Sequence, residues 1–168
     1  MENIRKSVYI ETTIPSYATS KASRDIITAH RQAITRLFWE NEQQRYDLFT
    51  SQFVIDECSR GDIEAAKRRL EFIKGITLIP ENNVIAELAE IYFSFLEIPE
   101  RAKTDCFHLA VCVDAKLHYL LSWNCSHIGM VSYAKVYEYN KKHGLWTPEF
   151  VTPELLMEFE REKSNEQP

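Results

Sequence analysis

Short apolar runs alternate with longer amphipathic segments along most of the chain. The short runs are rich in Val, Ile, Leu, Tyr and Phe, which favours buried strands at 7–10, 48–50, 76–80, 119–122 and around 150–151. Between them, apolar residues recur at helical spacing. This pattern predicts helices over 51–58, 62–73 and 83–96, with Ser51 as the cap of the first and Gly75 at the end of the second. It predicts a further helix from a Ser23 cap to at least Phe38, one that starts at Thr104 and one that ends at Gly144. A last helix starts at Pro153.

Two of these segments affect where a functional site can lie. The stretch 12–16 is predicted to be a loop, because Pro15 has no amide donor and restricts the residue before it. The helix that starts at Thr104 is apolar on most sides from Phe107 to Val113, so it is predicted to be central in the fold.

Strands that alternate with helices predict an α/β fold, with a mostly parallel central sheet of four to five strands and helices on both faces. No repeat or change of composition divides residues 1–160, which are expected to form a single domain, and the polar segment 161–168 is expected to be disordered. In such sheets ligands bind beyond the carboxyl ends of the strands. The residues that follow each strand are therefore the ones to inspect.

Composition and charge narrow the class of protein. The 168 residues are 45% hydrophobic and 27% charged, as in a globular domain. The chain lacks an apolar run long enough to span a bilayer and lacks an apolar secretory signal, so a cytoplasmic protein with four reduced cysteines is expected. The net charge of −5 does not by itself indicate nucleic-acid binding. A Gly-x-Ser-x-Gly elbow and a P-loop are both absent from the sequence, which argues against those two hydrolase classes.

Acidic and amide residues stand near the predicted strand ends. Glu11 directly follows the first strand, Asn124 lies just after the fourth, and Glu57 is in the helix after the second. Asp105 lies in the first turn of the central helix, where the helix dipole favours its charge. Taken singly, each carboxylate is better explained as a solvated surface group. As a set they suggest a metal ion, because a carboxylate beside an apolar helix needs a partner.

The order of these blocks resembles the four signature blocks of PIN domains. The blocks are the strand ending at Glu11 and the segments 50–57, 105–110 and 122–124, and the resemblance covers Ser7 to about Leu156. The longer strings 9–17 and 123–128 are similar to the branch of VapC-type toxin ribonucleases from bacterial toxin–antitoxin pairs. The resemblance implies a three-layer α/β/α domain and a metal-dependent ribonuclease, with the toxin of a type II pair as its biological setting.

The resemblance also assigns roles to residues. Glu11, Glu57 and Asp105 match the family's acidic residues and imply a Mg²⁺ or Mn²⁺ site, and Asn124 stands where many members have a fourth aspartate. All four are candidate catalytic residues. Two departures from the family pattern bear on activity: Glu11 is a methylene longer than aspartate, and Asn124 is neutral. Asn124 and the net charge of −5 motivate an alternative, a catalytically weak or inactive PIN-like module that binds protein or RNA.

Further candidates surround this set. Thr12 and Ser122 can hydrogen-bond the carboxylates, and Arg24, Arg60 and His127 can contact substrate phosphate, although ordinary loop and capping roles explain them equally well. A zinc site built from the cysteines and histidines is disfavoured, because the six-residue spacing of Cys106 and Cys112 does not match paired zinc ligands.

Three partners are expected if the resemblance holds: an RNA substrate, a cognate antitoxin, and a second copy of the chain in a homodimer. The aromatic-rich stretch 91–96 has more apolar positions than a helix with one buried stripe needs. It predicts either a helix buried on two sides within the domain or a surface that contacts a partner.

Overall fold

A single parallel sheet forms the centre of the molecule. The computed structural model describes residues 5–126, 128–129 and 131–165. Within them the strand order is β3-β2-β1-β4-β5, and every pairing is parallel. The strands are β1 (Ser7–Ile10), β2 (Asp47–Ser51), β3 (Thr77–Ile79), β4 (Tyr119–Leu121) and β5 (Glu149–Val151), which confirms the five apolar runs as strands.

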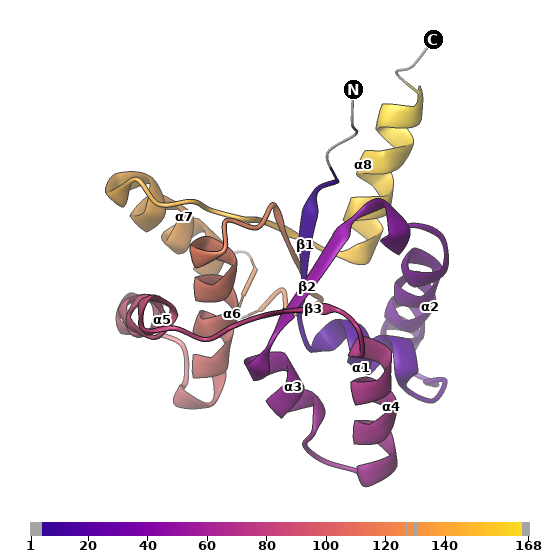
Figure 1. The fold of residues 1–168 in the computed structure, drawn as a ribbon. Helices are drawn as coiled ribbons and strands as arrows, with labels where there is room; N and C mark the ends of the chain where they lie inside the picture. Colours follow the sequence, from indigo (N-terminus) through magenta and orange to yellow (C-terminus); the bar gives the residue numbers. More distant parts are fainter. Residues whose placement is uncertain (1–4, 127, 130, 166–168) are drawn as a thin grey trace.

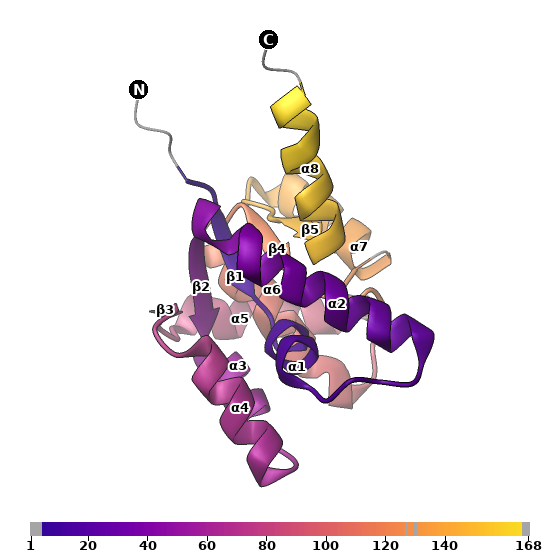
Figure 2. The same cartoon turned by 90° about the vertical axis from the view of Figure 1, so that its right-hand side faces the viewer.

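Helices cover both faces of this sheet and make three layers, as expected for a PIN-like α/β/α domain. Figure 1 shows α5, α6 and α7 on one side and α2, α4 and α8 on the other, and Figure 2 gives the view of the second side. The α-helices within the described residues are α1 (Thr13–Thr19), α2 (Ile26–Asn41), α3 (Gln52–Cys58), α4 (Ile63–Ile73), α5 (Asn83–Leu96), α6 (Lys103–Asp114), α7 (Val131–His143) and α8 (Pro153–Asn165), with short 3₁₀ turns at Gln43–Arg45 and Glu100–Ala102.

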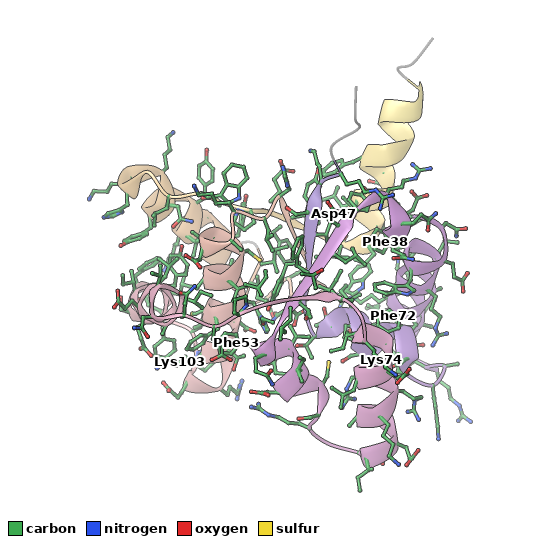
Figure 3. The ribbon with its side chains drawn as sticks, viewed as in Figure 1. Phe38, Asp47, Phe53, Phe72, Lys74 and Lys103 are labelled. Carbon is green, nitrogen blue, oxygen red and sulfur yellow. The ribbon has the colours of Figure 1, made fainter. Side chains whose placement is uncertain are left out.

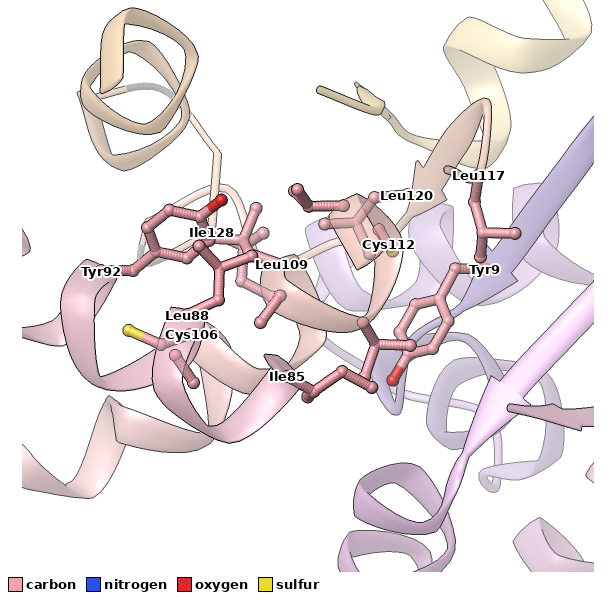
Figure 4. Close-up of a cluster of buried hydrophobic side chains, with 14 of the residues drawn as sticks. Tyr9, Ile85, Leu88, Tyr92, Cys106, Leu109, Cys112, Leu117, Leu120 and Ile128 are labelled. Carbon is pink, nitrogen blue, oxygen red and sulfur yellow. The ribbon is translucent and has the colours of Figure 1, made fainter. Parts of the chain in front are cut away.

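Side-chain alternation along the central strands builds a separate core on each face. Tyr9 and Leu120 belong to a cluster with α3, α5 and α6, shown in close-up in Figure 4. Val8, Ile10 and Leu121 belong to the other cluster, with α1, α2 and α8. Figure 3 shows side chains filling the spaces between the layers, with Phe38 on α2 and Phe53 on α3. The two cores fix the sheet in place and leave its carboxyl edge to carry the site.

Helix α6 has the central position that its sequence predicts. From Leu109 to Val113 every residue is buried, and Cys106 and Cys112 are small core residues. The other two cysteines, Cys58 and Cys125, are also free thiols. Helix α5 packs on α6, and in the stretch 91–96 Tyr92 and Leu96 are buried, Phe93 and Phe95 are partly buried, and Ile91 and Ser94 are exposed. Among the described helices, none combines the length and apolar character needed to cross a bilayer.

Two local expectations near the N-terminus were wrong. The stretch after Glu11 is helix α1, not a loop. Pro15 lies in the first turn of α1, where a backbone N–H has no intrahelical partner, so its missing donor is tolerated. The cap of α2 is Asp25, which accepts from the Thr28 N–H at 2.8 Å, and Ser23 instead accepts from the Asp25 N–H at 3.1 Å.

The end of the chain also differs from expectation. Helix α8 runs to Asn165, so residues 161–165 are helical, although they were expected to belong to a disordered tail. Residues 166–168 lie outside the described part.

Candidate functional site

The carboxyl ends of β1 and β4 form the topological switch point of the sheet. From β1 the chain proceeds outward through β2 and β3, and it then returns to the opposite side of β1 with β4 and β5. A crevice between neighbouring strands is expected at this reversal. Glu11 directly follows β1, and its N–H donates to the carbonyl of Leu121 at 3.2 Å. Ser122 and Asn124 follow β4, so these predicted site residues come together at one edge.

Glu11 is held by one of its two carboxylate oxygens. Its side chain is buried, and Oε2 accepts from the Thr13 N–H at 3.0 Å, the Thr13 hydroxyl at 2.5 Å and the Ser122 hydroxyl at 2.7 Å. The first turn of α1 therefore supplies two of the three donors. The glutamate side chain, which is one methylene longer than that of aspartate, reaches these groups from the end of β1. No described residue donates to Oε1, which is left for another partner.

Glu57 is held in the same manner from α3. Its Oε2 accepts from the Thr12 hydroxyl and from His108 Nε2, the latter at 2.9 Å. Burial alone raises the pKa of the Glu57 carboxyl. The hydrogen bond and charge of His108, the Thr12 hydroxyl and the nearby charge of Arg60 outweigh that effect, so the pKa lies below its ordinary value. Glu57 is thus a carboxylate at neutral pH, again with no donor to Oε1 among the described residues.

His108 joins the two glutamates. Ligand atoms of Glu11, Glu57 and His108 lie within 4.8 Å of one another, a grouping that can hold a metal ion. Burial disfavours protonation of the imidazole, but its hydrogen bond to Glu57 and the charges of Glu57, Glu11 and Asp105 raise the pKa of His108 above its ordinary value. The three groups form one electrostatic unit, since each charge affects its neighbours.

Asp105 and Asn124 lie beside this group and not within it. The Asn124 Nδ2 donates to Asp105 Oδ1 at 3.1 Å, and the Asn124 N–H donates to the Ser122 hydroxyl at 2.9 Å. Asp105 is buried near the start of α6, and its charge acts on His108. Of the predicted metal ligands, Glu11 and Glu57 thus meet directly, and Asp105 stands at their edge.

Comparisons with known proteins bear on the fold. Neither a protein-family model nor a curated protein sequence matches the chain. Among solved structures, VapC20 from Mycobacterium tuberculosis, described as a toxin that cleaves the sarcin–ricin loop, matches with a TM-score of 0.56 at 12% identity. That match covers 71% of this chain and 92% of VapC20.

A second match is VapBC2 from Rickettsia felis, in a structure bound to a DNA fragment from their promoter. The TM-score is 0.51 at 13% identity, over 87% of this chain and 98% of the matched chain. VapC toxins are PIN domains. The chain has the PIN-type fold. At these identities the likeness concerns the fold of the domain, and the chemistry of its site must be argued from its own residues.

The remaining predicted residues of this PIN-type domain are less closely connected to the site. Arg60 is exposed in the turn after α3, near enough to lower the pKa of Glu57. Arg24 is exposed before α2. His127 lies outside the described residues. The ligand group found among the described residues consists of Glu11, Glu57 and His108 and contains no cysteine.

Three polar residues of the site were missed as functional residues by sequence reasoning. His108 was considered only as a zinc ligand, and Thr13 and Tyr9 were not considered. A signal for His108 was present, because it follows Asp105 by three residues and therefore lies one helical turn along the same face. Thr13 and Tyr9 carry no comparable signal, since their roles depend on contacts made by the folded chain.

Proposed function

We propose that this PIN-type domain is a divalent-metal-dependent endoribonuclease that hydrolyses RNA phosphodiester bonds. The observation that carries the proposal is the convergence of two carboxylates, since ligand oxygens of Glu11 and Glu57 lie within 4.8 Å of each other, with a ring nitrogen of His108 beside them, beyond the carboxyl end of the sheet. Each glutamate has one oxygen held by protein donors and one directed to no described donor. Such carboxylates suit a hard cation, because its oxygen ligands must be both negatively charged and fixed in position.

The residues divide into holding and orienting roles. Glu11, Glu57 and Asp105 would hold Mg²⁺ or Mn²⁺, and Asn124 keeps the Asp105 carboxylate in one orientation through its amide. When bound, such an ion lowers the pKa of a coordinated water and stabilises negative charge at the scissile phosphate. Thr12, Thr13 and Ser122 fix the carboxylates before any ion arrives, so their hydrogen bonds preorganise the site.

RNA is the proposed substrate class. VapC20 is described as cleaving the sarcin–ricin loop, and the fold match covers 92% of VapC20 and 71% of this chain. The net charge of −5 opposes nonspecific binding of a polyanion, so contacts must come from local cations such as Arg60 beside Glu57. The VapBC2 match supports a further proposal, that the chain is the toxin of a type II pair and that an antitoxin restrains it.

Cleavage of mixed structured RNAs in Mn²⁺, Mg²⁺ or EDTA tests the proposal, with wild type compared to Asp105→Asn. Wild type should cleave only with metal, and Asp105→Asn should lose activity by about 100-fold or more, as when a group that stabilises transition-state charge is removed. Asp114→Asn is the matched control, because Asp114 lies at the far end of α6 and pairs with Asn82. It should cleave as wild type does.

The alternative function is a PIN-like binding module without useful catalysis. The neutral Asn124, which donates to Asp105 and adds no charge, favours this alternative. If wild type cleaves none of several RNAs in either metal, the nuclease proposal is wrong and the binding module takes its place.

A further inference from the structure

A chain of hydrogen-bonded polar side chains runs from the interior of the sheet to Glu57. Ser51 Oγ lies 2.6 Å from the Tyr9 hydroxyl, and the same hydroxyl lies 2.8 Å from His108 Nδ1. His108 Nε2 then reaches Glu57 Oε2 at 2.9 Å. This hydrogen-bonded series joins residues of β2, β1, α6 and α3.

The three inner members are removed from water. Ser51, Tyr9 and His108 are all 0% exposed. Figure 4 shows Tyr9 among the apolar side chains of its core cluster, with Leu117 and Leu120 nearby. A buried polar group without a partner is destabilising, so a fully connected set in an apolar core restricts each member to one arrangement.

The direction of the bonds assigns a role to His108. An ionised carboxylate only accepts hydrogen bonds, so Nε2 must carry a proton and donate it to Glu57. This holds for the neutral imidazole, which then accepts from Tyr9 at Nδ1, and for the imidazolium, which donates at both nitrogens. A protonated Nε2 has no lone pair for a cation. His108 therefore acts on Glu57 and does not itself serve as a ligand in this arrangement.

Glu57 needs such support more than Glu11 does. It projects from the seven-residue helix α3, its side chain remains 23% exposed, and it has two donors where Glu11 has three. A glutamate side chain has several rotatable bonds, and without its donors the carboxylate would sample several orientations. Both donors bind Oε2, and this directs Oε1 away from the protein donors.

We propose that the Ser51–Tyr9–His108 chain positions Glu57 for cation binding, with His108 as a positioning residue and Tyr9 fixing the ring of His108. The inference rests on the proposed metal site and adds to it the residues that set its affinity. Loss of a hydrogen-bonding partner behind a metal ligand typically weakens metal affinity by about 10- to 100-fold. The effect should appear in binding of Mn²⁺ by the free protein, without RNA.

The test measures Mn²⁺ affinity by titration calorimetry, with the fold checked by circular dichroism and thermal unfolding in EDTA. His108→Leu should weaken Mn²⁺ binding by about 10- to 100-fold. His108→Gln should stay within a few-fold of wild type, because glutamine can donate to Glu57 and accept from Tyr9. A role in packing alone would not separate these two variants in metal affinity.

A second pair of variants keeps the test decisive if His108→Leu does not fold. Tyr9→Phe should weaken Mn²⁺ binding, and Tyr92→Phe should not. Tyr92 is the matched control, since it is equally buried and donates at 2.7 Å to Asn140, away from the site. Equal Mn²⁺ affinity of wild type and Tyr9→Phe, or of wild type and a folded His108→Leu, overturns the positioning role alone. A wild-type protein that binds neither Mn²⁺ nor Mg²⁺ overturns the proposed metal site as well.

Discussion

Asn124 and Asp105 form an amide–carboxylate pair at the edge of the site. The Asn124 Nδ2 donates to Asp105 Oδ1 at 3.1 Å, and Asn124 Oδ1 accepts from the Ser126 hydroxyl at 3.3 Å. These two contacts fix the orientation of the amide. An ionised aspartate at position 124 could not donate to Asp105, so two negative charges would meet where a hydrogen bond now forms. The neutral residue therefore stabilises the site in the absence of metal.

Asn124→Asp should make stability depend on metal. In EDTA the variant should lose about 1–3 kcal/mol of unfolding free energy, because the lost hydrogen bond is replaced by repulsion beside the buried Asp105. Saturating Mn²⁺ should restore most of it, because a cation neutralises the pair. Urea unfolding with and without Mn²⁺ measures both effects.

Asn82→Asp is the control for that variant. Asn82 donates to Asp114 at 2.8 Å, so the substitution creates a similar like-charge pair on the exposed surface. Asn82 also caps α5 by accepting from the Ile85 N–H at 2.9 Å, a role that aspartate fills equally well. The unfolding free energy of this variant should therefore change by less than about 0.5 kcal/mol, with no recovery in Mn²⁺. If Asn124→Asp is as stable as wild type in EDTA, the amide donor has no structural role.

The candidate site could be predicted in part at the level of single residues. Glu11, Glu57 and Asp105 stand out because each occupies a defined place relative to a strand or a helix start. The contact between His108 and Glu57 spans 51 positions in the sequence, and no local pattern encodes it. It depends on how α6 packs against α3 in the folded chain.

Elements were easier to predict than their contacts, with α1 as the main exception. Strands and long helices follow from apolar periodicity, which short windows of sequence contain. Helix α1 has seven residues and no side-chain cap, so its local signal is weak. Burial of Ile14 and Pro15 and packing on α2 and α4 stabilise it. Tertiary contacts therefore make this segment helical, although its local sequence favours a loop.

Gly75 marks the end of α4 with a left-handed backbone conformation, and this gives a prediction for the element. Its φ is +85°, and a Cβ added there would meet no atom within 4 Å. Gly75→Ala should therefore lower the unfolding free energy through backbone strain alone, by about 1–2 kcal/mol. Gly75→Asn should have a smaller effect, since asparagine tolerates this conformation. Urea unfolding compares the two, and identical values for wild type and both variants would contradict the assigned strain.

At the scale of the whole molecule, the site exists only when the sheet and helices α3 and α6 are assembled. Glu11 follows β1, Glu57 lies on α3, Asp105 lies on α6 and Asn124 follows β4. In an unfolded chain these residues are far apart, so they cannot hold one ion together. Any ion that binds the site must therefore stabilise the entire fold.

Added metal should accordingly raise the melting temperature. Binding at 100 times the dissociation constant contributes about 2.7 kcal/mol, which corresponds to an increase of roughly 5–10 °C for a domain of this size. Thermal unfolding across a Mn²⁺ series measures the shift, and Glu57→Gln and Asp105→Asn should reduce it strongly. Leu88→Ala is the control, because it removes a buried core side chain of α5 that is not part of the site. It should lose about 2–5 kcal/mol of unfolding free energy and melt at a lower temperature in EDTA. Its increase in melting temperature with Mn²⁺ should equal that of wild type. An equal shift in Glu57→Gln would mean that the ion binds elsewhere on the molecule.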